Sequence, residues 1–139
     1  MGDHGGVDRQ RVGYWLAILL ALSQFSNVIR VGLDAQAYSV AMGLPLDSAA
    51  DVAWLHVYAL RALFLGGFAS VLIANRQYRA LSMMALLALI MPLGDFWLIW
   101  QAGGSAPALW RQALIAAVLV AAWFSLGRMA RQPHRAGPA

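Results

Sequence analysis

Two charged residues inside apolar segments are the ones best suited to do chemistry. Arg61 lies in "YALRALF" and Asp95 in "MPLGDFW". A lone charge at the centre of a membrane helix costs roughly 2.5 to 3.5 kcal/mol on insertion scales, so such residues are expected to face a bundle interior and to pair. Counted along two helices from the turn near residues 75–79, their depths differ by roughly 3 Å, which predicts an Arg61–Asp95 ion pair.

Asp95 is the candidate acid or base of this pair. In its protonated form it could activate an epoxide or a carbonyl group of an apolar molecule, with Arg30, Asn27 and Tyr58 stabilising the developing negative charge. Asp95 and Arg61 are therefore the candidate catalytic residues. The alternative is that the pair only fixes the register of two helices.

Other polar and aromatic side chains gather at the same level. In the first apolar segment Ser23, Asn27, Arg30 and Asp34 repeat at helical spacing along one face. In the third, Pro92 is expected to bend the helix just below Asp95. The outer half of the bundle is thus predicted to hold a polar pocket that opens outward, with these candidate ligand-binding residues: Asn27, Arg30, Trp54, His56, Tyr58 and Trp97.

Some of these residues have simpler interpretations. The tryptophans near the outer level could form the aromatic belt of a membrane protein, an interpretation that we favour for Trp100 and Trp110. His56 suits a local hydrogen bond, and because no second histidine lies near it we predict no metal site. Asp51 is three residues after Ser48, which predicts a capping box rather than a catalytic role. We expect no cofactor.

The composition explains why charges are so informative here. Of 139 residues, 61% are hydrophobic and 12% charged, whereas soluble domains are about half apolar and a quarter charged. The chain is therefore predicted to be a membrane protein without a large soluble domain. It has no cysteine, so disulfides and thiolate chemistry are excluded. The arginines form no basic stripe with interleaved aromatics, and we expect no nucleic-acid partner.

The apolar segments predict four transmembrane helices in a single domain of residues 1–139. The expected fold is an all-α membrane protein, an antiparallel four-helix bundle with both termini in the cytoplasm. A cleavable signal peptide ending near Ser23 is the alternative for the first segment. The predicted spans are 13–33, 50–75, 79–101 and 106–128, with tails at 1–12 and 129–139.

The connection "AQAYSVAMGLPLD", residues 35–47, is too short and apolar for a free loop. It is expected to form an interfacial helix or a re-entrant turn.

Loop charges predict the orientation. One side carries seven arginines and the other one arginine with three aspartates, so the first side is expected to be cytoplasmic, in a membrane that is most simply the bacterial cytoplasmic membrane. The seven are Arg9, Arg11, Arg76, Arg79, Arg128, Arg131 and Arg135; the others are Arg111, Asp34, Asp47 and Asp51.

Small residues recur every four positions in the second and fourth segments, which favours close helix packing and offers a surface for a homo-oligomer. The rows are Ala62, Gly66, Ser70 and Ala74, and Ala113, Ala117, Ala121 and Ser125.

The stretch from Leu55 to Gly104 resembles the small four-helix membrane proteins grouped as domain of unknown function 4267. The resemblance is in the arginine and the leucine- and glycine-bearing segment after it, Arg61 to Gly66, and in a later Pro-x-Gly-Asp, Pro92 to Asp95. It implies a four-helix membrane fold and directs attention to Arg61 and Asp95, without implying an activity.

Three functions remain open at this stage. The first, which we favour, is binding of a membrane lipid or other lipophilic small molecule in the outward-facing pocket, with or without its chemical modification. The second is transport of a lipid or small molecule. The third is an accessory role in a larger membrane complex, in which the Arg61–Asp95 pair is structural.

Overall fold

Residues 4–131 are the part that the computed structural model describes, with side chains described from residue 12, and all regular secondary structure in this part is α-helical. Four stretches, Val12–Leu33, Ala49–Ala74, Tyr78–Gln101 and Ala106–Ala130, are long and apolar enough to cross a membrane. The chain is therefore an integral membrane protein. The helices are α1 (His4–Leu33), α2 (Ala35–Met42), α3 (Ala49–Ala74), α4 (Tyr78–Ala88), α5 (Ile90–Gln101) and α6 (Ala106–Ala130).

The bounds of the four membrane stretches differ from those of the predicted spans by at most two residues. Helix α1 begins at His4 and so extends into the region predicted as a tail. Residues 1–3 and 132–139, Arg135 among them, lie outside the described part, as do the side chains of Arg9 and Arg11.

Helix α3 begins at the predicted capping box. The Ser48 hydroxyl accepts a hydrogen bond from the Asp51 backbone N–H at 3.3 Å, and the Asp51 carboxylate accepts one from the Ser48 N–H at 2.9 Å. The two bonds satisfy backbone donors that have no partner within the first turn of the helix. They set where α3 begins, and therefore how far along the helix each of its polar residues lies.

The third membrane stretch is interrupted where Pro92 predicts a bend. Helix α4 ends at Ala88 and α5 begins at Ile90. Proline lacks an N–H, so the carbonyl of Ala88 loses its ordinary helical partner, and the next donor, Leu93 N–H, reaches the Leu89 carbonyl at 3.3 Å. The interruption lies nearly two turns before Asp95 and sets the direction of the segment that carries it.

The segment between the first two membrane helices forms a short helix, as one of the two expectations had it. The Asp34 carboxylate caps α2 by accepting from the Ala37 N–H at 2.8 Å. Gly43 ends it with φ of +84°, a left-handed conformation that glycine adopts without strain. Tyr38 and Ser39 are both buried, so α2 is packed into the molecule.

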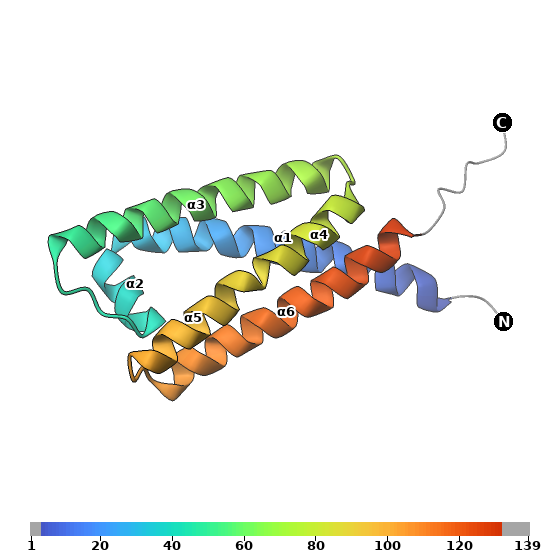
Figure 1. The fold of residues 1–139 in the computed structure, drawn as a ribbon. Helices are drawn as coiled ribbons and strands as arrows, with labels where there is room; N and C mark the ends of the chain where they lie inside the picture. The colour runs from blue at the N-terminus through green and yellow to red at the C-terminus, as the bar shows by residue number, and fades with distance from the viewer. Residues whose placement is uncertain (1–3, 132–139) are drawn as a thin grey trace.

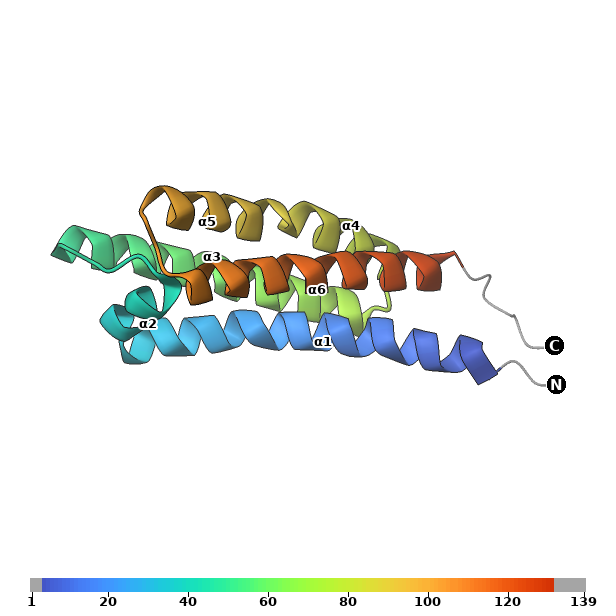
Figure 2. The ribbon, with the colours of Figure 1, turned by 90° about the horizontal axis from the view of Figure 1, so that it is seen from below.

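The helices pack as two layers. In one layer, α3 packs mainly against α1. In the other layer, both α4 and α5 pack against α6. The two layers are joined by contacts between α1 and α6, whereas α3 and α5 hardly touch. In Figure 1, α3 and α5 diverge from the α3–α4 turn, and α2 lies in the opening between them. Figure 2 shows α1 on the side of the molecule opposite α4 and α5. The start of α1 and the end of α6 lie at the same end of the molecule as the α3–α4 turn.

Close backbone approach joins α1 to α3. A Cβ added to Gly66 would lie 3.2 Å from the Gln24 Cβ and 3.3 Å from the Phe25 ring. Ala62 and Gly66, half of the predicted small-residue row, are thus used inside the chain. In the other row Ala117 and Ala121 are exposed.

Candidate functional site

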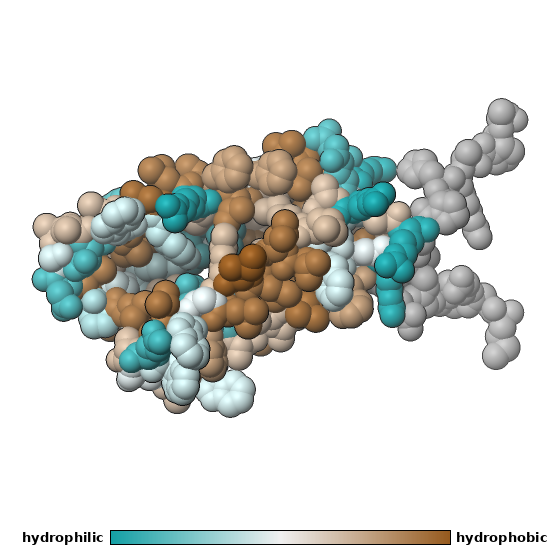
Figure 3. Space-filling model, in the orientation of Figure 1, coloured by the Kyte–Doolittle hydropathy of each residue, from teal (hydrophilic) through white to brown (hydrophobic). Residues whose placement is uncertain are grey.

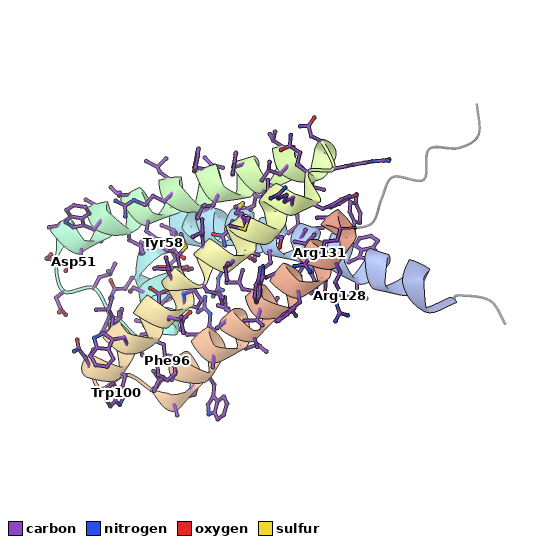
Figure 4. The ribbon with its side chains drawn as sticks, turned by 45° about the vertical axis from the view of Figure 1, so that its right-hand side comes forward. Asp51, Tyr58, Phe96, Trp100, Arg128 and Arg131 are labelled. Atoms are coloured by element: carbon purple, nitrogen blue, oxygen red, sulfur yellow. The ribbon has the colours of Figure 1, made fainter. Side chains whose placement is uncertain are left out.

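Two tyrosines form the centre of the polar cluster near α2. The Tyr38 hydroxyl donates to the Tyr58 hydroxyl at 3.2 Å, and the ring centroids are 6.1 Å apart. Tyr38 is only 2% exposed, and the Arg30 guanidinium lies over its ring at 5.6 Å. The bond between the two hydroxyls uses one of their two protons, so the tyrosine pair keeps one O–H for a further acceptor. Figure 4 shows Tyr58 on the side of α3 that faces the other helices.

Asp95 and Arg111 supply the charges of this cluster. Both act electrostatically on Tyr58, and Arg111 is the cation that acts on the half-buried Asp95 carboxyl. Arg111 is fixed by its Nη1, which donates to the Ala41 carbonyl of α2 at 3.3 Å. The short helix thus supplies the tyrosine and holds the arginine of α6 in place, while it packs mainly on α1 and α3.

The predicted Arg61–Asp95 ion pair is not formed. Between residues 12 and 131 no arginine nitrogen lies within 4.0 Å of an aspartate oxygen, and Arg61 is exposed. Equal depth did not bring the two together because α3 packs on α1 while α5 packs on α6. The two side chains do not meet: Arg61 lines a groove whose residues do not include Asp95, and Arg111 is the cation that acts on Asp95 instead.

Gln112 is a buried polar residue in the same part of α6. It is 2% exposed and its amide nitrogen has no hydrogen-bond partner. It lies on the buried face of α6, one turn after Ala108, and a Cβ added to Gly43 at the end of α2 would be 2.9 Å from Ala108. An unpaired buried amide costs roughly 1–3 kcal/mol, so natural proteins seldom keep one without a reason.

The remaining predicted ligand-binding residues are placed differently. Asn27 is half-buried on α1. His56 is exposed, and its Nδ1 is 2.9 Å from the Val52 carbonyl one turn earlier. Trp54 and Trp97 are 69% and 53% exposed, and Trp97 packs beside Trp100 with ring centroids 5.3 Å apart. The structure therefore brings Tyr58, Asp95 and, through Tyr38, Arg30 together, and leaves these two tryptophans and His56 at the surface.

Three residues of the cluster were not among the predicted site residues. Tyr38 lies in the connecting segment, and Arg111 and Gln112 lie in the second turn of α6. A signal for Tyr38 exists, because Asp34 and Gly43 are a helix cap and a helix stop separated by eight residues. Nothing in the sequence indicates that the Gln112 amide lacks a hydrogen-bond partner, because this depends on whether the neighbouring helices place an acceptor beside it.

The cluster can bind oxygen-bearing groups. Tyr58, Gln112 and Arg111 are hydrogen-bond donors, and Asp95 can accept a hydrogen bond or exchange a proton. No group of three or more histidine, cysteine or acidic side chains that could hold a metal ion is present among the residues described. The chemistry that these residues support is recognition of an electronegative atom in an apolar surrounding.

Fold and cluster together define a small all-α integral membrane protein with polar residues gathered around a short helix. The sequence matches the family described as Domain of unknown function (DUF4267) over residues 28–127. The match covers most of the chain, so the protein belongs to this family. No curated protein and no solved structure matches it.

Proposed function

We propose that the protein binds a lipophilic molecule that carries an acceptor oxygen, such as a carbonyl, ester or ether group, at the polar cluster near α2. The observation that carries this proposal is the Gln112 amide nitrogen, which is buried and has no partner. A donor held in an apolar interior favours a ligand that supplies the missing acceptor.

The surroundings of Gln112 support the same ligand class. The Tyr38–Tyr58 pair has one hydroxyl proton to donate, because the bond between the two rings uses only the other. Arg111 is held against α2 by the Ala41 carbonyl. Three donors in one region, with apolar helices on each side, match the usual binding site for a lipophilic molecule: mostly apolar, with a few polar groups that fix orientation.

Calorimetric titration tests the proposal directly. The protein in zwitterionic micelles is titrated with a decyl-tailed benzoquinone, whose carbonyl oxygens are acceptors, and with decylbenzene, which has the same tail and no oxygen. We expect the quinone to bind more tightly. Gln112→Leu and Tyr58→Phe should each weaken it by about fivefold, because a hydrogen bond contributes about 1 kcal/mol.

Ser82→Ala is the matched control variant. It also removes a hydrogen-bonding group from the interior, the Ser82 hydroxyl that donates to the Trp123 carbonyl at 3.0 Å, but in the half of the bundle away from α2. It should leave quinone binding unchanged. Equal binding of the two probes, or equal loss in all three variants, would favour the alternative in which the cluster serves only the structure of a transport or accessory subunit.

The orientation in the membrane is part of the proposal. We infer an antiparallel bundle in a bacterial cytoplasmic membrane, with both termini in the cytoplasm. Arg76, Arg79, Arg128 and Arg131 are all exposed, and Figure 4 shows Arg128 and Arg131 at the end of the molecule opposite Asp51 and Trp100. Arginine-rich loops stay on the cytoplasmic side. The polar cluster then lies in the outer half, and the exposed Ala117 and Ala121 of α6 are the surface left for a homo-oligomer.

A further inference from the structure

Arg61 is an exposed charge at the middle of a membrane helix. It stands midway between the ends of α3, Ala49 and Ala74, roughly 18 to 20 Å from each. The hydrocarbon core of a bilayer is about 30 Å thick, so an arginine here is at the depth where a charge is most costly. No carboxylate within residues 12–131 lies close enough to pair with it.

Around Arg61 the surface forms an apolar groove between α3 and α5. The groove has a volume of about 420 Å³, within the range of small-molecule sites. In Figure 3 the surface is hollowed between these helices, and a hydrophilic patch interrupts the hydrophobic middle of the molecule over α3. The residues that line the groove are Val57, Leu60, Arg61, Phe64 and Leu65 of α3 and Met91 of α5.

The groove is shaped for a chain-like molecule with one charged end. Its α3 residues recur at helical spacing, so they form a continuous strip along the helix. Leu60 and Phe64 are 66% and 69% exposed, and the Phe64 and Phe68 rings stack in parallel with centroids 6.0 Å apart, which continues the apolar strip past Arg61. Arg61 is the single charged residue among the groove residues.

We propose that this groove binds the carboxylate form of a long-chain fatty acid, with the carboxylate on Arg61 and the chain along Leu60, Phe64 and Phe68. Charge complementarity carries the choice, because Arg61 needs an anion in a low-dielectric setting. A fatty acid can enter hydrocarbon protonated and ionise beside the guanidinium. A phosphodiester headgroup stays charged at neutral pH and would have to be drawn to the bilayer centre.

A second copy of the chain is a poorer occupant of this groove. A dimer with two-fold symmetry places the same patch on both subunits. It would therefore bring one Arg61 near the other at the depth where like charges repel most strongly. The fatty-acid site is independent of the cluster near α2, since it uses no residue of that cluster.

Electron spin resonance of a labelled probe tests the inference. The protein in phosphatidylcholine nanodiscs is mixed with nitroxide-labelled stearic acid at alkaline pH, and nitroxide-labelled phosphatidylcholine serves as the reference lipid. We expect motionally restricted stearate in excess over the reference. Arg61→Leu should lower the relative affinity for stearate by about tenfold, as expected for a hydrogen-bonded charge, and Arg61→Lys should keep most of it.

Two controls make the result specific. Arg128→Leu removes an exposed arginine at the end of α6 and should leave stearate binding unchanged, and so should Gln112→Leu, which tests the other site. Stearate binding that is the same in Arg61→Leu as in the natural sequence would overturn the inference, whatever the quinone experiment gives.

A cross-linking experiment tests the second-copy alternative. Because the chain has no cysteine, Leu60→Cys introduces a unique thiol in the groove, and Leu22→Cys does so on an exposed face of α1. We expect no more cross-linked dimer from Leu60→Cys than from Leu22→Cys. Efficient dimer formation through Leu60→Cys alone would show that a second copy covers the groove and would overturn the fatty-acid assignment.

Discussion

Gln112 is the residue whose removal should have opposite effects on stability and binding. Its amide is buried without a partner, so the ligand-free protein bears the cost of desolvating it. Gln112→Leu, of similar size and apolar, should therefore raise the free energy of unfolding by about 1–2 kcal/mol. SDS titration followed by circular dichroism measures this change. A clear loss of stability would mean that the amide is satisfied in the membrane, for example by water.

Asp95 and Arg111 should be energetically coupled, and Asp95 and Arg61 should not. Arg111 acts on the Asp95 carboxyl, whereas Arg61 lies in a groove whose lining does not include Asp95. In double-mutant cycles of unfolding free energy, Asp95→Asn with Arg111→Gln should give a coupling of about 1 kcal/mol. Asp95→Asn with Arg61→Gln should be additive within about 0.5 kcal/mol. A larger coupling energy for Asp95 with Arg61 than for Asp95 with Arg111 would instead support the Arg61–Asp95 ion pair that depth alone predicts.

At this scale the sequence identified the costly residues and gave one of them the wrong partner. Intramembrane charges are rare enough to be found by composition, so Arg61 and Asp95 stand out. Depth along a helix follows from residue counting, but the direction of a side chain around the bundle depends on which helices touch. From the sequence Arg111 counts only as a loop charge, because its contact with Ala41 needs α2 folded into the molecule.

At the scale of helices, two adjacent glycines of α3 should respond in opposite ways. A side chain at Gly66 would meet Gln24 and Phe25 of α1, whereas nothing lies within 4 Å of a Cβ at Gly67. Gly66→Leu should lower the unfolding free energy by about 1–3 kcal/mol through overpacking. Gly67→Ala should raise it by up to about 1 kcal/mol through helix propensity. SDS titration of both variants gives the comparison, and equal effects would contradict the α1–α3 packing.

Local signals predicted the elements well because each depends on a few neighbouring residues. The capping box at Ser48 and the interruption near Pro92 follow from hydrogen bonds within one or two turns. The short connecting segment is compatible with an interfacial helix or a re-entrant turn from its sequence, and in the structure it contains a helix with Tyr38 and Ser39 buried. The sequence could not predict that α3 packs against α1 rather than α5, because a row of small residues does not specify which helix packs against it.

At the scale of the whole molecule, the orientation can be tested by thiol labelling. Asn75→Cys places a thiol at the α3–α4 turn and Ser105→Cys places one before α6, in a chain with no other cysteine. With a membrane-impermeant maleimide on intact bacterial cells, Ser105→Cys should react and Asn75→Cys should react only after permeabilisation. The excess of arginine at the α3–α4 end is the physical reason. The opposite labelling pattern would invert the proposed topology.

The divergence of α3 from α5 also gives the molecule a tapered outline. The helices lie close at the α3–α4 turn and spread at the other end, where α2 fills part of the space. Such a wedge occupies more area in one leaflet than in the other. A membrane that curves with the α2 side outward would accommodate this shape with less lipid deformation, so we expect the protein to favour such curved membrane over flat membrane.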